Sequence, residues 1–137
     1  MSHFSKLVVQ FTDAEALKAA LVNLGISADA VCCTKEPQPI RDYTGRDTRN
    51  KAHVRVPREK IASNTADMGW LLGEKSEAWL DAYANPVIQR NGGLDKFSNR
   101  VKQEYAAARI EQHARKQGKQ PRREVTQDGQ IKVYVGA

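Results

Sequence analysis

Two groups of basic residues carry the clearest chemical signal in this sequence. The first group surrounds an aromatic residue in a polar, irregular stretch and consists of Arg41, Tyr43, Arg46, Arg49 and Lys51. The second group lies near the C-terminus and consists of Arg115, Lys116, Lys119, Arg122 and Arg123. Cationic side chains bind phosphate oxygens, and a neighbouring aromatic ring can stack on a base. Together they form a candidate surface for an anion, a nucleic acid or a protein partner.

The positive charge is distributed unevenly along the chain. The formal net charge is +6, with 22 Lys or Arg against 16 Asp or Glu. Residues 100–137 contain nine Lys or Arg and four Asp or Glu, whereas residues 1–99 contain 13 and 12. A cationic helix end also favours the C-terminal dipole, and that effect alone would account for Arg115 and Lys116. The C-terminal charge is therefore consistent both with a binding surface and with a solvated helix end.

None of the residue patterns that catalysis or metal binding requires is present. The candidate zinc ligands, Cys32, Cys33, His3, His53 and His113, lack Cys-x-x-Cys or His-x-x-x-His spacing. There is no nucleophile elbow, P-loop or dinucleotide-binding motif. We therefore expect no catalytic residue, metal or cofactor, and a protein that is not an enzyme, with an unrecognised active site as the alternative.

The cysteines and the hydropathy pattern indicate a cellular compartment. Cys32 and Cys33 are adjacent, and adjacent side chains in a strand point to opposite faces, so we expect no disulfide and one cysteine in the core. No run of 18 apolar residues is present, and the N-terminus lacks the apolar segment of a secretory signal. A reducing compartment fits best: the cytoplasm, or an equivalent such as a stroma or a host cytoplasm.

The length of 137 residues predicts a single domain, residues 1–137. Ser5–Phe11 alternates and predicts an edge or half-buried strand. Thr12 and Glu15 match a capping box, and apolar residues at helical spacing then predict a helix over Asp13–Leu24 that stops at Gly25.

The middle of the chain predicts short strands. The first is Asp29–Lys35, which Pro37 and Pro39 end, so that residues 38–51 are expected to be a long loop. The next is residues 52–56, followed by a loop or a single helical turn over Arg58–Ala66. Two more strands are expected at residues 67–72 and 77–83, with a helix over residues 74–83 as the competing interpretation, and a loop is expected over residues 85–93.

The C-terminal part predicts a long helix and a hairpin. Leu94, Phe97, Val101, Tyr105 and Ala108 form the core stripe of a helix over Leu94–Gln117. Strands at residues 122–126 and 130–135 flank Asp128-Gly129, a strong turn signal. The element order predicts an α+β fold with a mostly antiparallel sheet, two main helices and a C-terminal β-hairpin.

Several short patches, in a shared order along nearly the whole chain, resemble one protein family. The patches are Met1-Ser2-His3-Phe4-Ser5-Lys6, Ala16-Leu17-Lys18-Ala19-Ala20-Leu21, Tyr43-x-Gly45 followed by Lys51-Ala52, Asp67-Met68-Gly69-Trp70, Gln103-x-Tyr105-Ala106 and Asp128-Gly129-x-Ile131. Through them the chain resembles the uncharacterised family named after chloroplast hypothetical reading frame thirty-five. Members of that family occur in chloroplasts, cyanobacteria, other bacteria and some viruses.

The resemblance implies a partner and not a reaction. The family has no agreed catalytic residues, and its genes often lie near an ATPase of the AAA+ type, which implies a protein partner. Glu104 stands where the family usually has Arg, which reverses a charge on the helix. Tyr43-x-Gly45 is the patch to test first, because a loop has no core periodicity to satisfy.

Two functions from different classes follow from these observations. The favoured hypothesis is a non-catalytic binding or adaptor domain that docks on a protein partner such as an AAA+ type ATPase. The alternative is a nucleic-acid-binding protein that uses residues 41–51 and the basic cluster of residues 115–123. A homo-oligomer stays open, because a basic edge hairpin can pair with another chain.

Overall fold

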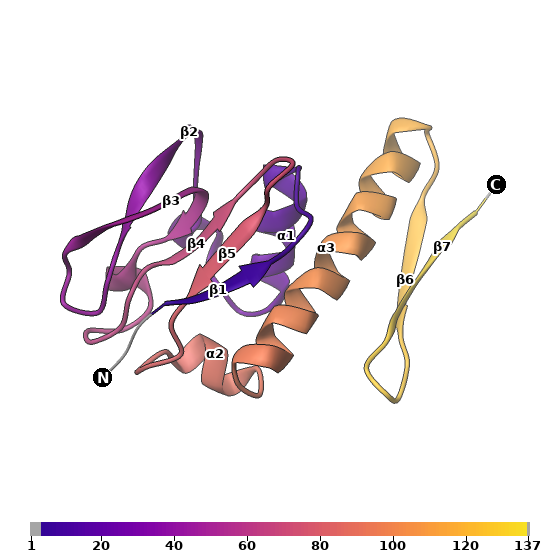
Figure 1. The fold of residues 1–137 in the computed structure, drawn as a ribbon. Helices are drawn as coiled ribbons and strands as arrows, with labels where there is room; N and C mark the ends of the chain where they lie inside the picture. Colours follow the sequence, from indigo (N-terminus) through magenta and orange to yellow (C-terminus); the bar gives the residue numbers. More distant parts are fainter. Residues whose placement is uncertain (1–3, 137) are drawn as a thin grey trace.

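A five-stranded antiparallel sheet lies at the centre of the molecule, and two long helices cover one of its faces (Figure 1). The computed structural model describes residues 4–136, so the first half of the Met1–Lys6 patch, including His3, lies outside the described residues. The strands of this sheet are β1 (Ser5–Val8), β2 (Cys32–Arg41), β3 (Asp47–Val56), β4 (Met68–Leu71) and β5 (Glu77–Leu80). Their spatial order is β1-β5-β4-β3-β2, so β1 and β2 are the two edge strands.

The remaining elements are three helices and a separate hairpin. They are α1 (Ala14–Asn23), α2 (Pro86–Arg90), α3 (Leu94–Lys116), β6 (Pro121–Val125) and β7 (Ile131–Val135). Strands β6 and β7 pair only with each other, and they pack against α3 on the side away from the five-stranded sheet (Figure 1). The predicted α+β class, both main helices and the C-terminal hairpin are confirmed.

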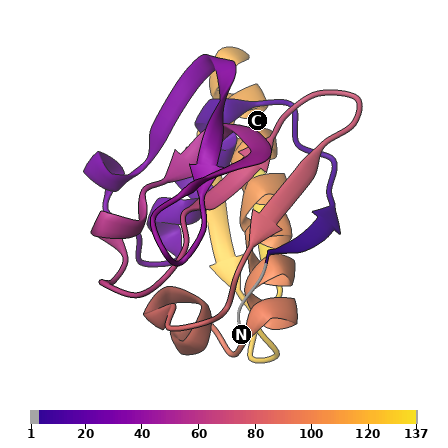
Figure 2. The same cartoon turned by 60° about the vertical axis from the view of Figure 1, so that its left-hand side comes forward.

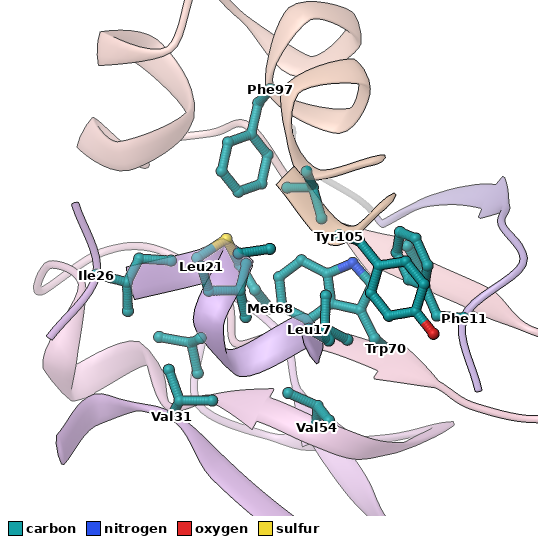
Figure 3. Packing of buried hydrophobic residues seen from close by; sticks show 14 of the residues in the cluster. Phe11, Leu17, Leu21, Ile26, Val31, Val54, Met68, Trp70, Phe97 and Tyr105 are labelled. Atoms are coloured by element: carbon teal, nitrogen blue, oxygen red, sulfur yellow. The ribbon is translucent and has the colours of Figure 1, made fainter. Parts of the chain in front are cut away.

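The hydrophobic core fills the space between the sheet and helices α1 and α3 (Figure 3). Trp70 and Val54 project from the sheet towards Leu17 and Leu21 of α1, and Phe97 reaches the same core from α3. These side chains are almost fully buried. Burying a large apolar side chain contributes about 1.5–3 kcal/mol, so this layer is the main source of stability.

The cap of α1 differs from the predicted capping box. Asp13, and not Thr12, is the N-cap, and its carboxylate accepts a hydrogen bond of 2.8 Å from the Ala16 amide. The Thr12 and Asp13 amides instead donate to the Tyr105 hydroxyl at 2.9 and 3.0 Å. The contact with α3 therefore moves the start of the helix by one residue, which local sequence spacing does not reveal.

The expected loop over residues 38–51 is wrong, because these residues form most of a β-hairpin. Strand β2 continues through Pro37 and Pro39, and β3 begins at Asp47. Proline is tolerated there because β2 is an edge strand. The pairing with β3 also shifts register on both sides of Gln38 and Pro39, so the ladder is interrupted where proline has no backbone N–H to donate. The outermost position also explains why Cys33 is exposed and Cys32 half-buried, so the expectation of a core cysteine is wrong.

The region after β3 decides three further predictions. The single helical turn expected within Arg58–Ala66 is confirmed as a 3-10 turn at Arg58–Lys60. Residues 77–80 form a strand and not the competing helix, because they pair with both β1 and β4. Within the expected loop over residues 85–93, helix α2 forms instead, because the Asn85 side chain accepts from the Ile88 amide and Pro86 occupies the first helical position.

Candidate binding groove

Only part of the first basic group is exposed and unpaired, because Arg41 is engaged in an ion-pair network. The Asp67 carboxylate accepts from the Arg41 amide at 2.7 Å and from its Nε and Nη2 atoms at 3.1 Å each. It also accepts from the Arg58 amide at 2.7 Å, and Asp67 is 2% exposed. Arg41 further contacts Glu59 at 2.6 Å. The hydrogen bond to Asp67, followed by the one to Glu59, raises the pKa of Arg41.

Arg58 connects the tip of the β2–β3 hairpin to the Asp67 network. Its Nη2 atom donates to the Tyr43 carbonyl at 3.0 Å, and its Nε atom donates to the Thr65 carbonyl at 2.8 Å. A Cβ atom at Gly45 would lie 3.2 Å from Nη1 of Arg58, and Gly45 has a φ of +88°. The Tyr43-x-Gly45 and Asp67-Met68-Gly69-Trp70 patches are thus parts of one structural cluster, which gives Tyr43-x-Gly45 a packing role.

An apolar contact holds the same hairpin against the sheet. We call residues 38–52 the β2–β3 arm. Gly69 lies on the sheet face opposite the helices, and a Cβ atom added there would lie 2.9 Å from both Ile40 Cγ2 and Ala52 Cβ. Ile40 and Ala52 are fully buried by this contact. The arm therefore folds over the outer face of the sheet and covers part of it.

The rest of the first group lies on the exposed side of the arm. Arg46, Arg49 and Lys51 are exposed, and none of them forms an ion pair with any residue between 4 and 136. Tyr43 is half-buried and meets the ring of Tyr83 edge-on, with centroids 5.8 Å apart. The arm therefore presents three free cations without an exposed aromatic partner from the predicted group.

The second basic group is divided in the same way. Arg123 contacts both Glu104 and Glu111 of α3. Burial would lower the pKa of Arg123, but its hydrogen bonds to Glu111 and Glu104 raise it. The negative charge of Glu104 is therefore paired with Arg123 of the hairpin. Arg122 stacks over Tyr134 at 4.7 Å, and the remaining cations, Arg115, Lys116 and Lys119, are exposed.

The two groups lie at opposite ends of the molecule. Figure 1 has the β2–β3 arm on the left and the hairpin of β6 and β7 on the right, with the sheet and α3 between them. The view turned by 60° has the arm in front and the hairpin behind (Figure 2). The ten candidate residues therefore do not form one continuous surface.

A groove that the sequence analysis did not identify runs between α3 and residues 9–11, the segment that continues from the end of β1. Its floor is apolar and consists of Val9, Phe11, Tyr105, Ala106 and Ile110. Its volume is about 670 Å³, and its charged lining residues, Lys102 and Arg109, are both cations. The rings of Phe11 and Tyr105 lie 4.4 Å apart, and the Tyr105 hydroxyl is fixed by the start of α1. The floor is therefore preformed.

A second hollow continues the apolar surface across α3. It shares Ala106 and Ile110 with the groove and reaches Ile131 and Val133 of β7. Ile110 is 48% exposed and stands on the ridge between the two hollows. Ile110 lies outside the predicted core stripe of α3, and an isoleucine at a solvent-facing helix position is the sequence signal that points to this surface.

The described part of the chain offers no group of three His, Cys, Asp or Glu side chains arranged to hold a metal ion. His53 accepts a hydrogen bond from the Leu72 amide at 3.0 Å, and His113 lies against Gln117 on the surface of α3. Burial raises the pKa of the Cys33 thiol, which disfavours the thiolate. Within residues 4–136, no helix has the length and apolar character needed to span a membrane.

The fold and the groove define an α+β domain with an exposed apolar groove along α3. The chain belongs to a family of proteins of unknown function, DUF1257, whose family model matches residues 20–134. No curated protein and no solved structure matches the chain.

Proposed function

We propose that this protein is a non-catalytic adaptor that docks on another protein through the groove between residues 9–11 and α3. The observation that carries the proposal is the exposed apolar ridge at Ile110, which joins two hollows. Exposed apolar patches that adjoin preformed hollows are typical of protein interaction sites. No chemistry is assigned to the groove, because its lining combines an apolar floor with cations and has no carboxylate, histidine or cysteine.

The first partner to test is an AAA+ type ATPase. This choice rests on the finer resemblance to the family named after chloroplast hypothetical reading frame thirty-five, whose genes often lie near such an ATPase. The proposed setting is the cytoplasm or an equivalent reducing compartment, where Cys32 and Cys33 stay reduced.

The test measures binding of the purified ATPase to the wild-type protein and to two variants. Ile110→Glu places a charge on the exposed ridge and is expected to weaken binding about tenfold or more. Val22→Glu is the matched control, because Val22 is a 39% exposed aliphatic residue on α1 that lines neither hollow. Equal binding by both variants would refute the proposed docking site.

Nucleic-acid binding by the C-terminal end is a second candidate. It is favoured by Arg115, Lys116, Lys119 and Arg122, which are exposed and have no ion-pair partner among residues 4–136. Binding to labelled single-stranded or duplex probes should weaken steeply with salt, because phosphate contacts release counterions. Arg122→Gln should reduce the affinity, whereas Lys35→Gln at the far edge of the sheet should not. No binding at low salt would rule this function out.

A further inference from the structure

The outer edge of β1 is an open strand edge, and the groove begins at residues 9–11, where the chain continues from β1. β1 pairs with β5 from Ser5–Leu80 to Val8–Glu77 and has no strand on its other side. No backbone hydrogen bond from the described residues reaches that side. Exposed strand edges of this kind accept an extended chain, whose backbone supplies the missing donors and acceptors.

The groove supplies the second element of an extended-peptide site. In a strand added to β1, alternate side chains would point to opposite faces of the sheet. One row would face α3, where Ala106 and Ile110 provide an apolar wall. Apolar side chains at every second position are therefore favoured on this face.

The charges around the groove decide the chemistry of the remaining positions. Lys102 and Arg109 line the groove; Lys102 has no ion-pair partner among residues 4–136, whereas Arg109 contacts Asp13 at 2.8 Å and keeps 48% of its side chain exposed. Lys6 of β1 contacts Glu77 at 3.1 Å, but its side chain is still 53% exposed. The unpaired Lys102, with the exposed parts of Arg109 and Lys6, favours acidic side chains in the incoming segment.

The same charges disfavour a second copy of this chain. In a second copy, β6 and β7 carry Arg122, Arg123 and Lys132 against a single acidic residue, Glu124. Its edge strand β1 carries Lys6 and no acidic residue, and its edge strand β2 carries Lys35 and Arg41 against Glu36. Pairing any of these strands with β1 would bring more cations than carboxylates towards Lys102 and Arg109. The chain as a whole also has a net charge of +6, which adds to the repulsion.

We propose that the occupant of the groove is an extended segment of the partner protein with alternating apolar and acidic residues, added as a strand to the outer edge of β1. This inference rests on the proposed function and specifies the docked segment. The backbone of β1 provides the affinity that is independent of sequence, and α3 with its flanking cations selects the side chains.

The test uses the full chain and a fluorescein-labelled peptide of alternating glutamate and valine. Its affinity is measured by fluorescence anisotropy, together with a lysine–valine peptide and a glutamate–valine peptide with N-methylated amides. We expect the unmodified acidic peptide to bind at least about tenfold more tightly than either control. Hydrogen exchange should slow at alternate amides of Ser5–Val8 when the acidic peptide is bound.

Two variants connect the peptide to the groove. Lys102→Glu should weaken the acidic peptide about tenfold and favour the lysine–valine peptide, whereas Lys35→Glu on β2 should change neither affinity. Both positions are exposed, and unchanged melting temperatures would show that the variants remain folded. Reversal of preference in Lys102→Glu alone supports the assigned charge contact.

Three outcomes would overturn the inference. These are no binding of the acidic peptide, equal binding of the N-methylated peptide, and slowed exchange in β1 that depends on protein concentration without peptide, which would identify a second copy. If the peptide fails while Ile110→Glu still weakens the ATPase, the docking site stands and the extended-segment inference falls. If both fail, the proposed function falls as well.

Discussion

The β2–β3 arm and the groove beside α3 use their residues in opposite ways. The arm is rich in Arg, yet Arg41 is directed inwards onto Asp67, and the neighbouring Arg58, which follows β3, donates to the Tyr43 and Thr65 carbonyls. Beside α3, an isoleucine is left exposed and the flanking Lys102 has no ion-pair partner among residues 4–136. Charged side chains thus build structure around the arm, and an apolar side chain on α3 marks the candidate interface.

This contrast shows that residue type alone does not identify a binding surface. Arginine can contribute five donors in a fixed geometry, so it fastens a loop as readily as it binds phosphate. What distinguishes the two roles is whether a buried acceptor lies within reach. Asp67, which directly precedes β4, provides such an acceptor for the arm, and the lining of the groove contains no equivalent.

The largest expected effect is the loss of the Asp67 cluster. Asp67→Ala removes the acceptor of four hydrogen bonds and leaves Arg41 without its buried partner. We expect a loss of about 2–4 kcal/mol in the free energy of unfolding, measured by denaturant titration. Glu59→Gln, at the exposed end of the same network, should cost less than about 1 kcal/mol. Equal losses in the two variants would mean that the burial of Asp67 does not determine its contribution to the free energy of unfolding.

The second prediction tests the apolar contact of the arm. Gly69→Ala places a methyl group 2.9 Å from Ile40 and Ala52, and such overpacking costs about 1–3 kcal/mol. Denaturant titration should show this loss, and faster proteolysis within the arm should accompany it. Gly136→Ala is the control, since a Cβ atom there meets nothing within 4 Å. A stable Gly69→Ala protein would contradict the close approach of the arm.

The third prediction concerns the attachment of the C-terminal hairpin. Arg123→Ala leaves Glu104 and Glu111 without their shared partner, and we expect a loss of about 1–2 kcal/mol. Hydrogen exchange should accelerate in β6 and β7 more than in the five-stranded sheet. The neighbouring Arg122→Ala, which removes only the stacking on Tyr134, should have a smaller effect. Uniform acceleration throughout the protein would argue against a locally fastened hairpin.

The smallest effect is a pH dependence at the start of α1. Although burial would raise the pKa of Asp13, hydrogen bonds from the Ala16 amide and Gln112, together with Arg109, hold it below its ordinary value. Its contribution to stability is therefore present above its unfolded pKa and is lost as the pH falls through the lower folded pKa. Asp13→Asn keeps a capping oxygen but cannot titrate. The melting temperature of this variant should therefore fall by a few degrees less than that of the wild type between pH 5 and pH 2. An unchanged profile would contradict this assignment.

The elements that local pattern defines were the ones that could be predicted. The stripe from Phe97 to Ala108 and the turn at Asp128-Gly129 depend on residues close in sequence, and both are confirmed. The second half of strand β2 was not predicted, because Pro37 and Pro39 ordinarily end a strand. They are tolerated here because β2 lies at the edge of the sheet, and only the order of the strands reveals that position.

The candidate site was harder to predict than the fold. The contacts of Arg41 with Asp67 and of Arg123 with Glu104 join residues far apart in sequence, so spacing could not show that these cations are engaged. The groove depends on Phe11 and Tyr105 meeting across most of the chain. Ile110 was visible as an apolar residue outside the core stripe, but its exposure depends on how far the hairpin covers α3.

The pairing of β1 with β5 has a consequence for how the chain acquires its structure during synthesis. β1 leaves the ribosome well before its ladder partner, which ends at Leu80, and before Tyr105, whose hydroxyl anchors the following turn. At about 5–20 residues per second, the N-terminal strand waits several seconds for these partners. Throughout that interval both of its edges, and not one, are open to other chains. A segment that binds the outer edge in the finished protein could therefore also protect β1 while the polypeptide is still being made.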